Sequence, residues 1–168
     1  MQGGTECVFF LVLVGYPYRM NFEPKAPDFE SRVRASFALQ STMQTLGIEI
    51  VRIEPGKIEF SMPYSANFTQ QHGYIHAGII TTALDSACGY AAFSLMPSTA
   101  EVLTVEFKTT LIAPAKGERF LFRANVIKPG RTLTYCEARA FGVVNSEERL
   151  IATMSGTLFA VYENAASR

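Results

Sequence analysis

The segment from His76 to Leu95, HAGIITTALDSACGYAAFSL, constrains the fold more than any other part of the chain. Its apolar residues recur at helical spacing and cover most of a helix circumference, which predicts a helix buried on more than one side. Asp85 is its only carboxylate. An ionised acid in apolar surroundings costs several kcal/mol unless it is hydrogen-bonded or solvated, so Asp85 belongs either to a local structural network or to a functional site.

The rest of the chain predicts a sheet that could enclose this helix. An amphipathic helix is expected over 29–46, begun by Asp28 and stopped by Gly47. Runs rich in β-forming residues cover 48–54, 57–63, 101–113, 118–128, 131–144 and 149–162, with a polar loop over 64–75. Turn residues separate the last four runs, which are therefore expected to pair as an antiparallel meander. The predicted class is α+β, with about six antiparallel strands wrapped around one long central helix and a further N-terminal helix.

Composition limits the possible functions. A chain of 168 residues with 48% apolar content fits one domain, which we expect over 20–168. Residues 1–19 are expected to be an extension without an assigned function, or an added edge strand. Their apolar run, 7–15, is too short to span a membrane. Fifteen basic residues balance fifteen acidic ones without clustering, which argues against nucleic acid as a partner.

The cysteines point to a reducing compartment. The chain has three of them, and their spacing fits neither a disulfide framework nor a zinc site. We therefore expect a cytoplasmic protein with no metal and no cofactor.

The central helix presents two separate chemical features. Gly78, Thr82, Asp85 and Gly89 form a stripe of small residues around the acid, and the backbone N–H groups at the start of the helix are free to bind an oxyanion. Ala77 and Asp85 are separated by about 12 Å along the axis, too far to act on one bond. If both act together, they must come from two helices running in opposite directions. This predicts an obligate homodimer with two shared sites.

These residues also carry a resemblance to a known family. Gly73, the sequence His76-Ala77-Gly78, and an acid nine positions after the histidine resemble the HGG…D segment of hot-dog-fold acyl-CoA thioesterases, particularly the phenylacetate-pathway (PaaI-type) branch. The resemblance extends over about 29–162 and includes 103–107, 114–117 and the turn 130–133. It implies a hot-dog fold, an acyl-CoA substrate and a homodimer that could pair further into a dimer of dimers.

The resemblance also implies roles for particular residues. Asp85 would be the general base or the nucleophile, the Ala77 N–H would polarise the thioester carbonyl, Thr104 would help to position water, and Gln70 would lie near the thioester. The implied substrate-binding residues are Gly73, His76, Gly78, Lys128 and Arg131. Two departures, Ala77 for glycine and Gln70 for the usual asparagine, leave substrate and rate open.

Other interpretations remain. Asp85 could be a buried structural acid, and the domain could bind acyl-CoA without turnover. A dehydratase or hydratase ranks last, because His76 and Asp85 do not match the pairing those enzymes use. Cys88 is better interpreted as a buried small hydrophobe than as a nucleophile, because no base is paired with it.

Overall fold

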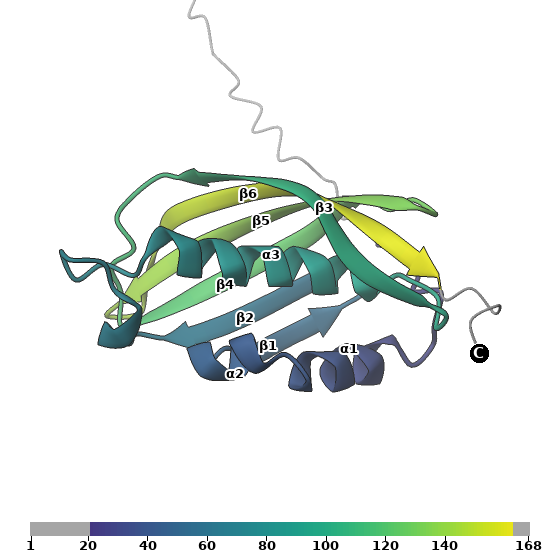
Figure 1. Ribbon diagram of the computed structural model, residues 1–168, viewed down its shortest axis with the longest axis horizontal. Helices are drawn as coiled ribbons and strands as arrows, with labels where there is room; N and C mark the ends of the chain where they lie inside the picture. The colour runs from purple at the N-terminus through teal and green to yellow at the C-terminus, as the bar shows by residue number, and fades with distance from the viewer. Residues whose placement is uncertain (1–20, 163–168) are drawn as a thin grey trace, which may run out of the picture.

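A computed structural model describes residues 21–162 of the chain. The helices are α1 (Phe29–Ala38), α2 (Ser41–Leu46) and α3 (Ala77–Phe93), with a short 3-10 turn η1 (Ala66–Phe68). The strands are β1 (Glu49–Glu54), β2 (Lys57–Pro63), β3 (Ala100–Leu111), β4 (Arg119–Lys128), β5 (Leu133–Val144) and β6 (Glu147–Tyr162). Figure 1 shows one sheet curving around α3. The predicted fold class is confirmed.

The order of the strands differs from the predicted four-strand meander. The sheet runs β1-β2-β4-β5-β6-β3, with every neighbouring pair antiparallel, so only β4, β5 and β6 form a meander. Residues 112–118 cross the end of the sheet, where Ile112 and Ala113 donate to the Ile151 carbonyl and Glu118 donates to that of Val143. β4 carries the fully buried Phe120 and Phe122 and takes a central position, whereas β3, with its exposed apolar side chains, lies at the edge.

The predicted single helix over 29–46 is wrong in detail, because it is two helices. Gln40 adopts an extended backbone conformation between α1 and α2, and Leu39 beside it is 85% exposed. The break lets both helices turn apolar residues inward, and Val33 and Met43 are both buried. Gly47 ends α2 in the left-handed conformation, as predicted.

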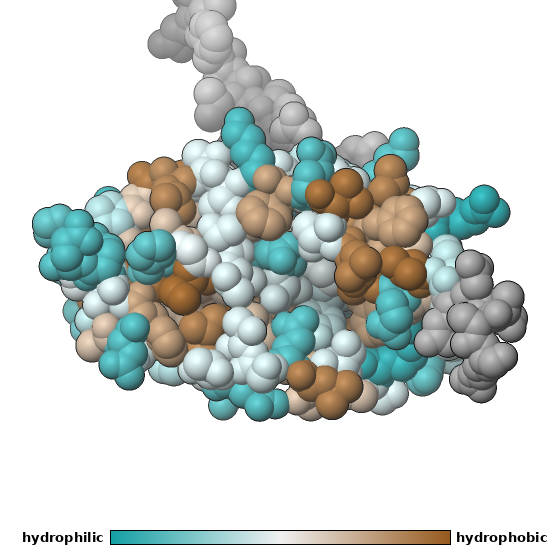
Figure 2. Space-filling model, viewed as in Figure 1, coloured by the Kyte–Doolittle hydropathy of each residue, from teal (hydrophilic) through white to brown (hydrophobic). Residues whose placement is uncertain are grey.

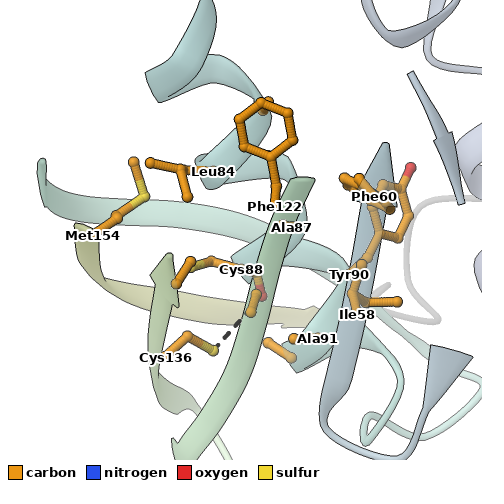
Figure 3. Packing of buried hydrophobic residues seen from close by; sticks show 14 of the residues in the cluster. Ile58, Phe60, Leu84, Ala87, Cys88, Tyr90, Ala91, Phe122, Cys136 and Met154 are labelled. Carbon is orange, nitrogen blue, oxygen red and sulfur yellow. Dashed lines mark hydrogen bonds between the residues drawn. The ribbon is translucent and has the colours of Figure 1, made fainter. Parts of the chain in front are cut away.

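The core lies between α3 and the concave face of the sheet. Figure 3 shows Leu84, Phe122 and Met154 packed on one side and Phe60 with Tyr90 on the other. The Cys136 thiol donates to the Cys88 carbonyl at 3.6 Å, and both cysteines are buried and free. Burial raises the pKa of the Cys88 thiol to about 12, so this residue packs as a small hydrophobe, as the sequence indicated.

The predictions for residues 1–19 lie outside the described residues. Within 21–162, no helix combines the length and apolar content needed to cross a membrane.

Candidate active site

Asp85 and Thr104 form a hydrogen-bonded pair on the face of α3 that β3 only partly covers. The Thr104 hydroxyl donates to Asp85 Oδ1 at 2.8 Å. A bulge between Thr104 and Glu106 breaks the regular pairing of β3 with β6 at this point. Burial raises the pKa of the Asp85 carboxyl, and the hydrogen bond from Thr104 opposes that rise. The site therefore holds a partly desolvated carboxylate of increased basicity.

The start of α3 presents one free backbone donor. His76 is the N-cap, and its Nδ1 accepts the N–H of Gly78 at 2.9 Å. The N–H groups of Ile79 and Ile80 reach the His76 carbonyl. Ala77 is the first helical residue and has no carbonyl one turn earlier to bond, so its N–H is left for a ligand, and the helix dipole adds to its attraction for negative charge. His76 thus caps the start of α3, with Nδ1 as the acceptor.

A pocket of about 480 Å³ opens beside Ala77. It is lined by Gln70, Tyr74, Ile75, Ala77, Ile80, Leu111, Ile112, Ala113, Pro114, Ala115 and Ile151. The structure thus brings the predicted residues Gln70 and Ala77 together at one cavity. The lining after β3 was not predicted from the sequence, because the expected meander placed residues 112–113 at the end of a strand and residues 114–117 in a simple turn. The apolar pair Ile112-Ala113 beside a chain reversal was the sequence feature that could have indicated these pocket-lining residues.

The loop before α3 holds Gln70 and Gly73 in a tight turn. The Gly73 N–H donates to the Gln70 carbonyl, and the Gln70 N–H donates to that of Tyr74, both at 2.9 Å. Gly73 has φ of +81°, which favours glycine, and no atom lies within 4 Å of where a Cβ would be, which leaves open space beside the turn. The Gln70 side chain accepts the His72 N–H, so its Nε2 is free to donate to a ligand.

Lys128 and Arg131 lie at the opposite end of the molecule from this pocket. They flank the β4–β5 turn, where the Arg131 carbonyl accepts the Tyr162 hydroxyl at 2.9 Å. Arg131 also lines a small cavity of about 110 Å³ with residues that follow α3, such as Leu95 and Met96. Within one chain, these cations therefore do not meet Ala77 or Gln70.

Strand β3 leaves an apolar edge exposed. It bonds to β6 on one side, and no strand of the described residues pairs with the other. Leu103 is 62%, Val105 59% and Phe107 47% exposed. Figure 2 shows apolar patches on the face that carries α3 and β3, separated by a paler band. A long unpaired apolar edge is normally covered in natural proteins.

No group of three or more His, Cys, Asp or Glu residues within 21–162 is arranged to hold a metal ion. The chemistry available at the site is that of a carboxylate, a hydroxyl, an amide and a backbone N–H. A base with a preorganised donor is the equipment for adding water to an acyl carbonyl. The fold is that of a hot-dog domain, and these groups are of the kinds that acyl hydrolysis uses.

Comparisons with known proteins agree with an acyl-hydrolysing hot-dog domain. Residues 72–147 match the family described as the Thioesterase superfamily. The crystal structure of a thioesterase family protein from Silicibacter pomeroyi is 57% identical, with a TM-score of 0.79, covering 80% of this chain and 98% of that one. This chain belongs to the thioesterase superfamily, and the predicted thioester hydrolase class is confirmed.

More distant relatives share the fold or part of the sequence. Human acyl-coenzyme A thioesterase 13 is 29% identical over 105 residues, covering 61% of this chain and 74% of that protein. A putative esterase of Saccharolobus solfataricus is 29% identical over 92 residues, covering 55% of this chain and 65% of that protein. The PaaI protein of E. coli has the same fold, with a TM-score of 0.72 at 17% identity over 82% of this chain and 96% of that one.

Proposed function

We propose that the protein hydrolyses acyl-CoA thioesters, using Asp85 of one subunit and the Ala77 N–H of a second. The observation that carries the proposal is the pair of incomplete half-sites on α3. One half-site holds the Asp85–Thr104 pair, and the other holds the free Ala77 N–H at the mouth of a pocket. Acyl-CoA as substrate is supported by the name of the human relative.

In the proposed reaction, the Asp85 carboxylate takes a proton from water, and the resulting hydroxide adds to the thioester carbonyl. Negative charge then develops on the carbonyl oxygen, where the Ala77 N–H and the dipole of α3 stabilise it. Collapse of the tetrahedral intermediate breaks the C–S bond, and the proton passes from Asp85 to the leaving CoA sulfur. Direct attack by Asp85 to give an anhydride, which water then hydrolyses, is the alternative.

The dimer is supported by the surface around β3. Pairing two β3 edges antiparallel would satisfy the unpaired backbone groups along 103–107, bring the apolar side chains of this segment beside those of the second copy and continue the sheet into it. The two α3 helices would then run in opposite directions. Ala77 lies about 12 Å from Asp85 along its own helix, so only the second copy can bring the donor to the acid.

The same arrangement gives a role to the cations at the far end of the sheet. In an antiparallel dimer, Lys128 and Arg131 of one copy lie toward the pocket end of the other. We propose that they bind phosphate groups of CoA, because phosphate binding does not require precisely placed cations. The free thiols of Cys88 and Cys136 are consistent with the proposed cytoplasmic location. We propose that two such dimers can associate further into a dimer of dimers.

Mixing two inactive variants tests the shared site. Asp85→Asn removes the base, and Ala77→Pro removes the donor while suiting the first helical position, since His76 before it is already extended. Each variant alone should lose at least about 100-fold in turnover. After unfolding and refolding together, random pairing should restore about a quarter of wild-type activity, because each mixed dimer keeps one intact site.

Matched controls make the result interpretable. Ala77→Gly keeps the N–H and should stay active. Its activity would show that Ala77→Pro is inactive because it lacks the N–H, and not because the first residue of the helix was replaced. Two active single variants would refute the assigned roles. Inactive variants that never complement would refute the shared site. Acyl-CoA binding without turnover by the wild-type protein would favour the non-catalytic module.

A further inference from the structure

The pocket at the start of α3 is bounded mainly by hydrocarbon. Its walls are formed mainly by aliphatic side chains from four parts of the chain: Ile75, Ile80, Leu111, Ile112, Pro114 and Ile151. None of the described residues that line it is Asp, Glu, Lys, Arg or His. Ile80 and Ile151 are also buried in the core behind it, so these parts of the wall are held rigidly.

Polar contact in the pocket is limited to a few residues. The lining residues offer the free N–H of Ala77 and two polar side chains, the amide of Gln70 and the hydroxyl of Tyr74. If the Ala77 N–H binds the thioester carbonyl oxygen, the acyl chain attached to that carbonyl would therefore lie beside an apolar cavity. The cavity lies in the same chain as the donor, so it needs no residue from a second copy.

We infer that this pocket binds the acyl chain and selects uncharged hydrocarbon acyl groups of medium length over short acyl groups and over acyl groups that end in a second carboxylate. The inference rests on the proposed function and specifies its substrate class. The site lies between the Ala77 end of α3 and the 112–115 crossover.

The size of the pocket argues against a short acyl group. A volume of about 480 Å³ lies within the range of sites for small organic molecules. It is many times the volume of a water molecule, about 30 Å³, so an acetyl group would leave most of it unfilled. Each methylene buried against these walls should raise kcat/KM by about fourfold until the pocket is full.

The charge of the pocket argues against dicarboxylic acyl groups. A terminal carboxylate would lose its hydration here and meet no cation among the described lining residues. The desolvation of one unpaired charge should reduce kcat/KM by at least about 100-fold relative to a neutral acyl group of equal length.

The first test uses the wild-type protein and a matched acyl-CoA series. CoA release would be measured with acetyl-, butanoyl-, hexanoyl- and octanoyl-CoA, and octanoyl-CoA would be compared with its ω-carboxylate analogue, suberyl-CoA. We expect kcat/KM to rise about 100-fold or more from butanoyl to octanoyl, and suberyl-CoA to be at least about 100-fold poorer. A flat series, or equal rates for octanoyl- and suberyl-CoA, would overturn the inference.

A second test fills the pocket. Ala113→Leu adds bulk to the pocket wall from the crossover, and the octanoyl-to-butanoyl ratio of kcat/KM should fall at least about tenfold. Ala35→Leu makes the same chemical change on an exposed position of α1, and its ratio should match the wild type. An unchanged ratio in a folded Ala113→Leu protein would place the acyl chain elsewhere.

Failure of the proposed function would be seen separately. If no acyl-CoA is hydrolysed, the thioesterase proposal fails, but the pocket can still be tested by NMR titration with the free acids octanoate and suberate. Octanoate binding that shifts Ile80 and Ile151 signals, is weaker in Ala113→Leu and exceeds suberate binding would support the pocket assignment. Equal binding of both acids, or binding of neither, would overturn it.

Discussion

Replacing Thr104 by valine should shift the pH dependence of turnover without disturbing the strand. The Thr104 hydroxyl donates to Asp85 Oδ1 at 2.8 Å, which stabilises the charged carboxylate and lowers its pKa against the rise caused by burial. Hydrogen bonds to charged groups contribute about 1.5–3 kcal/mol, and Thr104 is exposed on the described surface, so the lower value applies. One pKa unit corresponds to about 1.36 kcal/mol, so losing the hydrogen bond from Thr104 should raise the pKa of Asp85 by about one unit.

The expected observable is the acidic limb of the profile of kcat/KM against pH, which reports the essential base of the free enzyme. In Thr104→Val this limb should move to higher pH by about one unit, and kcat/KM below both midpoints should fall about tenfold. Valine has nearly the shape of threonine and suits a strand. Thr104→Ser keeps a hydroxyl and should keep the wild-type limb. An unmoved limb in Thr104→Val would show that the hydroxyl does not tune the base.

Three further predictions concern stability and assembly. Asp85→Asn should raise the free energy of unfolding at pH 7. A carboxyl whose folded pKa lies above its ordinary value of 3.8 destabilises the fold increasingly as pH rises from 3.8 through the folded pKa, so thermal melts at pH 7 and pH 3 should show the gain only at pH 7. Ser94→Ala should cost about 1–3 kcal/mol in urea unfolding, because the buried Ser94 hydroxyl accepts the Gly56 N–H at 2.8 Å; an unchanged midpoint would contradict this. Val105→Lys should turn the proposed dimer into monomers in sedimentation and abolish turnover, because it would place two like charges at the proposed paired edges; an active dimer would argue against β3 pairing.

The elements of the fold were largely predictable because their patterns are local. Apolar residues at every second position along 120–126 are visible in the sequence, and Phe120, Phe122 and Ala124 are indeed buried in the core. Strand order was not predictable in the same way, since it depends on which strand fits beneath α3. The turn residues at 114–117 mark a change of direction, but a crossover and a hairpin use the same residue types.

In the candidate site, too, the local features were predictable from the sequence and the contacts between distant segments were not. The N-cap role of His76 and the free Ala77 N–H follow from helix-end chemistry that the sequence displays. The contact between Thr104 and Asp85 joins residues on different elements through a bulge, and no spacing in the sequence measures such a contact. It could be suggested only by resemblance to a family. The pocket walls were missed because they come from four separate segments.

The exposed edge of β3 also has a consequence for the life of the newly made chain. Among the described residues, β3 pairs with β6, which comes later in the chain than every other strand, so the sheet edge at β3 cannot form until β6 has been made. From that moment, the chain carries a long row of unpaired backbone groups flanked by apolar side chains, which can pair with any other unfinished strand in its surroundings. An uncovered β3 edge is therefore an aggregation hazard, and the proposed pairing of two β3 edges would remove it.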